Sequence, residues 1–277
     1  MYNIPFTKMP GLGNDYIYIN CIDNSINDPH SLAVEMSDRH KRIGADRINL
    51  ITRFEVADFR TKMYNSDGSE RDMCGNACRC IAHYVYDKKL TKKTHFSIET
   101  NAGIKHAEVI LHNTTVTGIT IDTGTASFSP NKIPADSESE IIDRPLKISS
   151  SIYNITVLSV GNPHCILFVD DLENIDIKFI GSEIEKHPLF PKKANIEFVK
   201  LDANINIRAR VWERGSGVCA IAVAVNKLFH APNRQTIHMP NGDLEIYINP
   251  KNNHIYMTGE AEFVYEGMYK TKQLVYQ

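Results

Sequence analysis

The sequence predicts an α+β protein of two pseudo-symmetric domains, each a mixed or antiparallel, β-barrel-like sheet wrapped around a central helix. Two observations lead to this fold class. A Gly-Asn pair lies beside a strand-like segment at residues 13–14 and again at residues 161–162. A cysteine near the start of an apolar helix follows each pair, since Cys74 lies 60 residues after Asn14 and Cys219 lies 57 residues after Asn162. We expect the two helix starts to face each other across a cleft that holds the active site.

The first half contains, in order, a strand, a helix, a strand and a second helix. Residues 16–19 combine aromatic and β-branched side chains, which favours a strand, and residues 31–39 are expected to be helical. A strand is predicted near residues 57–63. The turn signal Asp67-Gly68 then precedes a helix of small and apolar residues that runs from Ala77 to about Asp87.

The second half repeats this order. Residues 155–160 and 165–169 are predicted strands on either side of the second Gly-Asn pair, and residues 179–186 are predicted to be helical. A strand over 207–212 and a helix over 219–229 complete the repeat. His164, which follows a proline in a tight turn, is expected to be structural, with its imidazole bonded to nearby backbone.

A linker is expected around residues 125–134, where Ser, Pro and Asn accumulate between strands. The predicted domains are therefore 1–128 and 129–265.

Composition indicates a globular protein and excludes several classes of partner. The 277 residues are 42% hydrophobic and carry a formal net charge of −2, which leaves no electrostatic footprint for nucleic acid. No apolar run approaches the roughly 20 residues that span a bilayer. Because residues 1–5 lack a basic and then apolar signal, the expected location is the cytoplasm.

The six cysteines show no disulfide framework, so free thiols are expected. Cys74, Cys78 and Cys80 form a C-x3-C-x-C pattern that matches neither zinc knuckles nor iron–sulfur runs. We therefore expect no metal, and we interpret Cys78 and Cys80 as small helix residues that pack against the sheet.

Cys74 is the strongest candidate for chemistry. The first amides of a helix lack internal partners and carry the positive end of its dipole, which favours a thiolate there. Cys74 is thus a candidate base or nucleophile, and the alternative is a buried structural cysteine.

Residues 65–79 resemble the first active-site signature of diaminopimelate epimerases, with Met73-Cys74-Gly75-Asn76 following Asn65-Ser66-Asp67-Gly68-Ser69-Glu70. Further motifs resemble that family in the family's order, and the similarity runs from about Phe6 to Glu266. They are Lys8 to Tyr16, Asp38-Arg39-His40, Ile43-Gly44-Ala45-Asp46, Gly161-Asn162-Pro163-His164, Asn195-Ile196-Glu197-Phe198, Trp212-Glu213-Arg214-Gly215 and Tyr256-Met257-Thr258-Gly259. The family's fold implies that a last strand near 268–275 returns to the first domain, which would add residues 266–277 to it.

The resemblance implies an isomerase that interconverts LL- and meso-diaminopimelate, a step toward lysine and peptidoglycan, without a cofactor. In the family, one cysteine thiolate removes the α-proton while a second thiol delivers a proton to the opposite face. Cys74 is implied as one of the pair and Cys219 is the candidate for the other. A small amino acid is the implied ligand and a homodimer the implied assembly. The implied substrate-binding residues are Asn14, Arg47, Asn65, Gly75, Asn76, Asn162, Asn195, Glu213 and Arg214.

Four departures from the family pattern leave alternatives open. The family's second cysteine lies in an Ala-Cys-Gly-Thr-Gly segment about nine residues after the Glu, whereas Glu213 is followed by Gly215-Ser216-Gly217-Val218-Cys219. Either Cys219 is the equivalent thiol on a shortened loop, or about eight residues and the second thiol are absent. Pro10 and Lys41-Arg42 also depart from the usual residues, and Arg47 stands where Gly or Gln is usual, so it could block the substrate or bind its carboxylate. The alternative functions are a catalytically impaired or non-catalytic homologue that binds an amino acid, and another cofactor-independent racemase or isomerase of this fold.

Overall fold

A computed structural model describes residues 2–203, 205–212, 217–272 and 275–276. The chain divides into two compact units, which are described one at a time. Unit 1 comprises residues 1–121 and 259–277, and unit 2 comprises residues 122–258.

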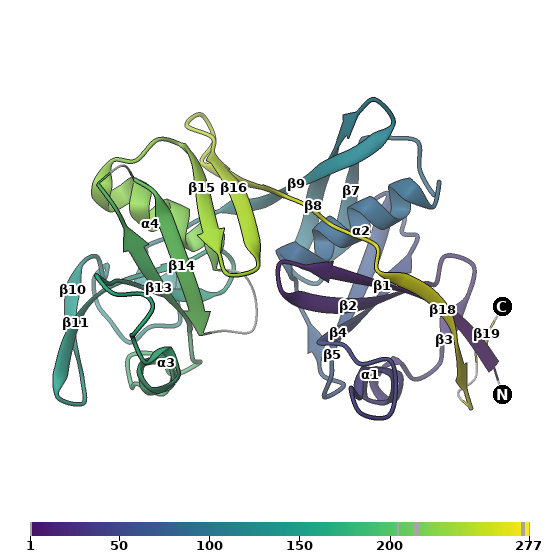
Figure 1. Ribbon diagram of the computed structural model, residues 1–277, viewed down its shortest axis with the longest axis horizontal. Helices are drawn as coiled ribbons and strands as arrows, with labels where there is room; N and C mark the ends of the chain where they lie inside the picture. Colours follow the sequence, from purple (N-terminus) through teal and green to yellow (C-terminus); the bar gives the residue numbers. More distant parts are fainter. Residues whose placement is uncertain (1, 204, 213–216, 273–274, 277) are drawn as a thin grey trace. The chain divides into compact units, whose positions relative to one another are not determined.

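Unit 1 is a sheet with two helices (Figure 1). Its helices are α1 (Pro29–Ser37) and α2 (Gly75–Asp87). Its strands are β1 (Tyr2–Gly11), β2 (Asn14–Asn20), β3 (Ser25–Ile26), β4 (Arg47–Thr52), β5 (Phe59–Asn65), β6 (Glu70–Arg71), β7 (His95–Thr100), β8 (Gly103–His112), β9 (Thr115–Thr125, whose last residues belong to unit 2), β18 (Tyr265–Thr271) and β19 (Val275–Tyr276).

Unit 2 has the same kind of architecture. Its helices are α3 (Ile177–Glu185), α4 (Val218–Phe229) and the short 3-10 helix η1 (Pro130–Lys132). Its strands are β10 (Arg144–Ile148), β11 (Ser151–Ser159), β12 (Pro163–Phe168), β13 (Asn195–Leu201), β14 (Ile207–Trp212), β15 (Arg234–Met239), β16 (Gly242–Ile248) and β17 (His254–Gly259).

The two units repeat one order of strand pairings. In unit 1, β1–β2 is antiparallel, β2–β4 parallel, β4–β5 antiparallel, β5–β7 parallel and β7–β8 antiparallel. In unit 2, β11–β12, β12–β13, β13–β14, β14–β15 and β15–β16 alternate in the same way. Each parallel pair is connected through a helix, as parallel strands require. This repetition confirms the predicted α+β fold with two pseudo-symmetric halves.

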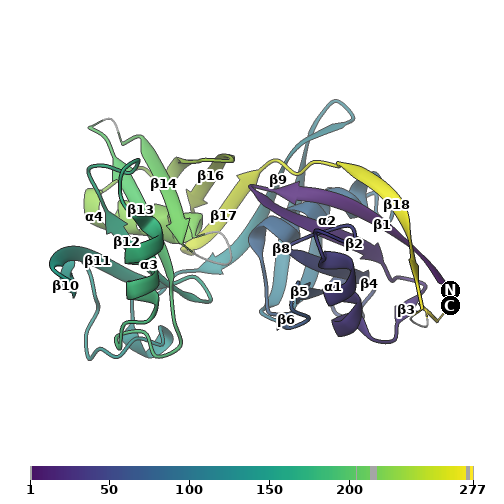
Figure 2. The same ribbon diagram turned by 60° about the horizontal axis from the view of Figure 1, so that its bottom comes forward.

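The C-terminal strand completes the sheet of unit 1. β18 pairs antiparallel with β1 along seven positions, from Tyr2 opposite Thr271 to Lys8 opposite Tyr265. Figure 2 shows β18 running beside β1. β18 thereby fills the place in unit 1 that β10 fills beside β11 in unit 2.

The helices α2 and α4 are the buried helices of their units. Residues 76–82 of α2 and 218–222 of α4 are buried, and many are Ala or Cys. Short side chains let strands approach a helix closely from several sides. These two segments can therefore lie buried within their units. Cys78 and Cys80 are completely buried, as expected for packing residues.

The helix boundaries differ from the sequence predictions by a few residues because of their caps. Helix α1 begins at Pro29 because the Asp28 carboxylate accepts a hydrogen bond from the Ser31 amide, and proline suits the first helical turn. Helix α3 begins at Ile177, two residues early, because Asp176 caps the Phe179 amide in the same way. Two strands also differ from their predicted bounds. Strand β5 begins at Phe59 instead of near residue 57, and strand β11 begins at Ser151 instead of residue 155.

Candidate active site

Cys74 is the residue immediately before α2. It is the N-cap, with an extended backbone (φ −146°, ψ 119°), and only 5% of its surface is exposed. The Tyr16 hydroxyl lies 3.3 Å from the Cys74 Sγ. The prediction that Cys74 opens a helix is therefore confirmed, and the thiol lies in a buried polar environment.

The pKa of the Cys74 thiol lies below its usual value. Burial acts to raise this pKa, but the Arg47 guanidinium, the Tyr16 hydroxyl and the Ala77 amide each stabilise the thiolate and outweigh the burial. By contrast, burial raises the pKa of Cys78 and of Cys80 to about 12. Among these three thiols, Cys74 is the one whose pKa is lowered.

Three side chains form a row across β2, β4 and β5. Tyr16 is paired with Arg47, and Arg47 is paired with Asn65, so the three lie on one face of the sheet. The Arg47 Nε donates to the Asn65 Oδ1 at 3.0 Å, and the Asn65 amide donates to the Ser69 Oγ at 2.9 Å. Arg47 is only 4% exposed. The Arg47 guanidinium is therefore held inside unit 1 by its hydrogen bond to Asn65.

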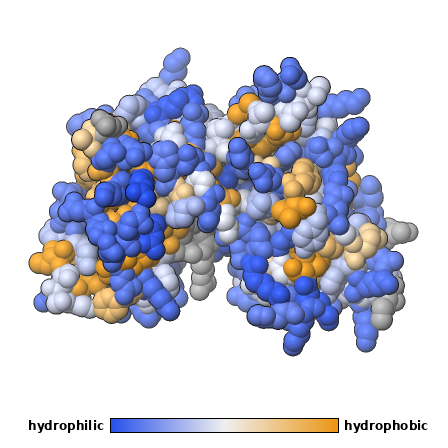
Figure 3. Space-filling view, in the orientation of Figure 1, coloured by the Kyte–Doolittle hydropathy of each residue, from blue (hydrophilic) through white to orange (hydrophobic). Residues whose placement is uncertain are grey.

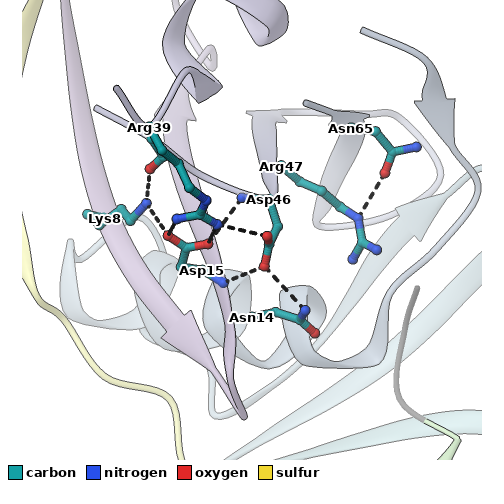
Figure 4. A network of polar contacts seen from close by, with 8 residues as sticks. Lys8, Asn14, Asp15, Arg39, Asp46, Arg47 and Asn65 are labelled. Carbon is teal, nitrogen blue, oxygen red and sulfur yellow. Dashed lines mark hydrogen bonds and ion pairs between the residues drawn. The ribbon is translucent and has the colours of Figure 1, made fainter. Parts of the chain in front are cut away.

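Asn14 is held between two side chains, both from unit 1. Its amide nitrogen donates to the Asp46 Oδ2 at 3.3 Å (Figure 4). Its Oδ1 accepts from the Asn76 Nδ2 at 3.4 Å. Asn76 is buried, and its Oδ1 has no hydrogen-bond partner among the described residues. A donor group on a ligand could satisfy that oxygen, because a buried acceptor is costly to leave unpaired.

A charged network fixes Asp46 in turn (Figure 4). The Arg39 guanidinium binds both carboxylate oxygens of Asp15, at 2.9 Å and 2.5 Å, and reaches the Asp46 Oδ1 at 2.8 Å. Lys8 pairs with the Asp15 carboxylate at 2.7 Å and donates to the Gly44 carbonyl. Burial acts to raise the pKa of Asp15, but Arg39 and Lys8 together hold it well below its usual range.

Sequence reasoning missed the roles of Tyr16, Lys8, Asp15, Arg39 and Asp46. The signal was present, because all five lie inside motifs that carry the family resemblance. These five residues lie on β1, on β2 and in the segment between α1 and β4. These segments contact one another only in the folded unit.

Unit 2 presents a different helix start. The N-cap of α4 is Gly217, and Cys219 is the second residue of the helix, 3% exposed, with the Thr123 Oγ1 at 3.7 Å from its Sγ. A Cβ on Gly217 would lie 2.0 Å from the Glu197 Oε1, so this carboxylate packs against the helix start. Glu213 and Arg214, predicted to bind substrate, lie outside the described residues.

His164 makes different contacts from those predicted. Its Nδ1 lies 2.7 Å from the Glu197 Oε1 and its Nε2 lies 3.0 Å from the Asn162 Oδ1, so it bonds side chains rather than nearby backbone. The prediction was wrong because His164 belongs to β12, next to β13, and not to a turn. Burial raises the pKa of Glu197 although His164 opposes this. Asn195 donates to the Pro163 carbonyl at 3.1 Å.

The predicted site residues thus form two groups, one in each unit. Unit 1 brings together Asn14, Arg47, Asn65, Cys74, Gly75 and Asn76. Unit 2 brings together Asn162, which immediately precedes β12, and Asn195 on the adjacent strand β13. All six cysteines are free thiols, as predicted. In the part of the chain that the structure describes, no three His, Cys, Asp or Glu side chains are placed to hold a metal ion together, and no helix is both long and apolar enough to cross a membrane.

Several solved structures share this fold. A hydroxyproline epimerase from Agrobacterium vitis matches with a TM-score of 0.70 and 13% identity, covering 96% of this chain and 92% of that chain. A PhzF-family phenazine biosynthesis protein from Bacillus anthracis matches with a TM-score of 0.69 and 17% identity, covering 98% of this chain and 100% of that chain. The fold therefore places the chain in the structural class that these proteins share.

Within that class the chain belongs to the diaminopimelate epimerase family, whose model matches residues 6–129 and 156–264. It is 44% identical over 271 residues to a diaminopimelate epimerase of Methanococcus maripaludis, covering 95% of this chain and 98% of the relative. It is 42% identical over 271 residues to one of Acetivibrio thermocellus, covering 95% and 97%. The family resemblance seen in the sequence motifs is confirmed, and with it the isomerase class.

Proposed function

We propose that this protein is a diaminopimelate epimerase that interconverts LL- and meso-diaminopimelate by proton transfer at the α-carbon. The observation that carries the proposal is the buried Cys74 thiol at the start of α2, with Tyr16 and Arg47 beside it and a pKa below the usual value. A base of this kind, in a chain of this family, suits removal of a weakly acidic α-proton. The reaction would serve lysine and peptidoglycan synthesis.

In the proposed mechanism the Cys74 thiolate removes the α-proton from one face of the substrate. The free amides at the start of α2, beginning with Gly75 and Asn76, stabilise the negative charge that develops on the carboxylate. A thiol on the other face delivers a proton to the carbon, so that the configuration inverts and the two sulfurs exchange roles. Thiols carry out both transfers, and no cofactor is required for this chemistry.

Cys219 is the proposed second thiol, since it lies near the start of α4, the helix equivalent to α2. The substrate's two amino-acid ends are assigned to the residues that match the family's motifs. They are Asn14, Asn65, Gly75, Asn76, Asn162, Asn195, Glu213 and Arg214, with Arg47 at a position that differs from the family pattern.

A second candidate function is a catalytically impaired homologue that binds an amino acid. Cys219 favours this candidate, because it is the second residue inside its helix whereas Cys74 is the residue before its helix. A displacement of about 1 Å can cost about 100-fold in rate, so a thiol in a different helical position is a weaker proton donor to the same carbon.

Proton exchange separates the two candidates. The purified protein is incubated in D₂O with LL- and, separately, meso-diaminopimelate, and deuterium at the α-carbon and the stereochemistry of the product are measured by NMR and chiral chromatography. Deuterium incorporation with inversion supports the epimerase. Binding without exchange of either isomer supports the impaired homologue, and Cys74→Ala gives the background.

We also propose a homodimer located in the cytoplasm. Most of the face seen in Figure 3 is hydrophilic, with hydrophobic residues interspersed. Val264, Tyr265 and Met268 nevertheless expose 60%, 44% and 60% of their surface within one short stretch at β18, as a contact surface for a second copy would. Light scattering of the wild type and of Met268→Glu tests this, with a monomeric wild type contradicting it.

A further inference from the structure

We propose that Tyr16 is a positioning residue for Cys74, a buried hydroxyl that holds the sulfur in place and donates a hydrogen bond to it when it is a thiolate. The Tyr16 hydroxyl lies 3.3 Å from the Cys74 Sγ, and either atom can be the donor while Cys74 is a thiol. A thiolate has no proton to donate, so the hydroxyl is then the donor. The inference rests on the proposed function only for the use to which the thiolate is put.

The hydroxyl depends on this contact because it lies in the interior of unit 1. Tyr16 and Cys74 are both buried, and Tyr16 is buried completely. A tyrosine hydroxyl that is removed from water needs a hydrogen-bond partner, and the Cys74 Sγ lies within reach of it. A hydrogen bond to a charged acceptor is stronger than one to a neutral acceptor. The hydroxyl therefore favours the thiolate of Cys74 over the thiol.

The Tyr16 ring is held from more than one side, so its hydroxyl has a defined position. The ring meets that of Tyr18 edge to face, with the centroids 6.1 Å apart and an interplanar angle of 69°. Gly11 leaves room for it, since a Cβ on Gly11 would lie 3.1 Å from the Tyr16 Cε2 and 3.1 Å from the Asn76 Cβ. A fixed ring orients the sulfur, and a displacement of about 1 Å in a catalytic group can cost about 100-fold in rate.

Tyr18, two residues further along β2, puts the same group to a different use. Its hydroxyl is equally buried, but it donates to the Ala77 carbonyl at 3.1 Å. That carbonyl belongs to the first turn of α2. Tyr18 thus holds the backbone of the helix, whereas Tyr16 contacts the sulfur.

The other titratable and charged groups around Cys74 do not replace this hydrogen bond. They are the Tyr18 hydroxyl on β2, the Arg47 guanidinium on β4, the Arg71 guanidinium on β6 and the Cys78 and Cys80 thiols on α2. Burial raises the pKa of Tyr18 and of both thiols, so these groups are neutral near pH 7. The two guanidiniums are still present when the Tyr16 hydroxyl is removed, so they do not mask its effect.

The test is a titration of Cys74 without substrate. Thiolate absorbance in the ultraviolet is followed against pH for the wild type, Tyr16→Phe and Tyr18→Phe, and the signal of the same protein carrying Cys74→Ser is subtracted from each. Tyr16→Phe removes one oxygen and keeps the ring. Tyr18→Phe is the matched control, because it removes an equally buried hydroxyl from the same strand. Circular dichroism establishes that each variant is folded.

The midpoint of the Cys74 titration is expected to rise in Tyr16→Phe. The expected rise is about 1 to 2 pH units, which corresponds to one hydrogen bond to a charged group. The midpoint of Tyr18→Phe matches that of the wild type, because the hydroxyl removed there is bonded to the helix backbone.

A midpoint in folded Tyr16→Phe equal to that of the wild type overturns the proposal. An equal rise in Tyr16→Phe and Tyr18→Phe also overturns it, since any buried hydroxyl of this strand would then have the same effect. If Tyr16→Phe does not fold, 3-fluorotyrosine is incorporated in place of Tyr16. Fluorine makes the phenol a stronger hydrogen-bond donor, so the midpoint should fall, and an unchanged or higher midpoint overturns the proposal.

The titration is independent of the epimerase assignment. Because no substrate is present, failure of that assignment would appear in the exchange experiment and leave this titration unchanged. The two failures are therefore distinguishable.

Discussion

Helices α2 and α4 occupy equivalent places in the two units, yet their first residues create different chemical environments. In unit 1 the N-cap is Cys74, whose thiol lies 3.3 Å from the Tyr16 hydroxyl and whose pKa the Arg47 guanidinium helps to lower against the effect of burial. In unit 2 the N-cap is Gly217, which packs against the Glu197 carboxylate, and Cys219 lies two residues later. A repeated backbone thus does not imply a repeated charge.

The strand registers show which residues correspond. Tyr16 pairs with Arg47 on β2 and β4, and His164 pairs with Asn195 on β12 and β13, so His164 takes the place of Tyr16 and Asn195 that of Arg47. The cation of unit 1 therefore has a neutral amide as its counterpart. The surroundings of the helix start thus favour the thiolate form of the cysteine in unit 1, whereas in unit 2 a buried histidine and a buried carboxyl group contact each other.

Removing the thiol of unit 1 should have the largest effect. Cys74→Ala is expected to lose both α-proton exchange and inversion of diaminopimelate, a loss of about 10²–10⁴-fold or more, because its thiolate is the proposed base. Folding should survive, since removing one small side chain costs at most a few kcal/mol. Isotope exchange and thermal unfolding measure the two effects. Cys78→Ala, one turn further along α2, is the control, and exchange lost equally in both variants would contradict the assignment.

Removing the Cys219 thiol of unit 2 should reduce inversion of diaminopimelate and leave α-proton exchange in place. Cys219→Ala is expected to reduce inversion by about 10²–10⁴-fold, while Cys74 alone can still remove and return a proton on its own face. Deuterium would then enter one isomer with retention of configuration, which NMR and chiral chromatography detect together. Inversion at the wild-type rate in Cys219→Ala would show that the two helix starts are not a matched catalytic pair.

Weakening the charged network of unit 1 should have a smaller effect on catalysis. Asp46→Asn weakens the contact with Arg39 and so loosens Asn14, which is expected to lower kcat/KM by about 10- to 100-fold. Steady-state kinetics on both isomers give the values. Asp58→Asn is the control, since Asp58 pairs with Lys93 elsewhere in the unit. Equal kinetics for Asp46→Asn and the wild type would mean that Asn14 needs no support from Asp46.

The smallest expected effect is a pH dependence of stability. The folded pKa of Cys74 lies below its usual value of 9.0, so its thiolate stabilises the fold above that value, and this stabilisation is lost as pH falls through the folded pKa. The free energy of unfolding of the wild type minus that of Cys74→Ser should therefore increase as pH rises through this window. Urea denaturation at several pH values measures the difference. A difference that stays constant or decreases would show that Cys74 is not the thiolate of unit 1.

Local patterns predicted much of the fold. Apolar periodicity and turn residues predicted α1, α2, α3 and α4 to within a few residues of their observed bounds. The differences at the starts of α1 and α3 arise because each start is fixed by a capping residue, Asp28 or Asp176. The similar spacing of Asn14 to Cys74 and Asn162 to Cys219 predicted the repeat that the strand pairings confirm. His164 was misjudged because a Gly-Asn-Pro turn hides the fact that the next residue already belongs to a strand.

The family, the repeated α+β architecture and the position of Cys74 at a helix start can be read from the amino-acid sequence, because they depend on motif order, hydrophobic period and turn chemistry. The groups that surround each thiol become visible only in the folded chain. The pairing of β2 with β4 brings Arg47 beside Tyr16, whose hydroxyl lies near the Cys74 thiol, and the packing of β13 against the start of α4 places Glu197 beside Gly217. Charge and burial at a site come from such long-range contacts, so spacing along the chain does not reveal them.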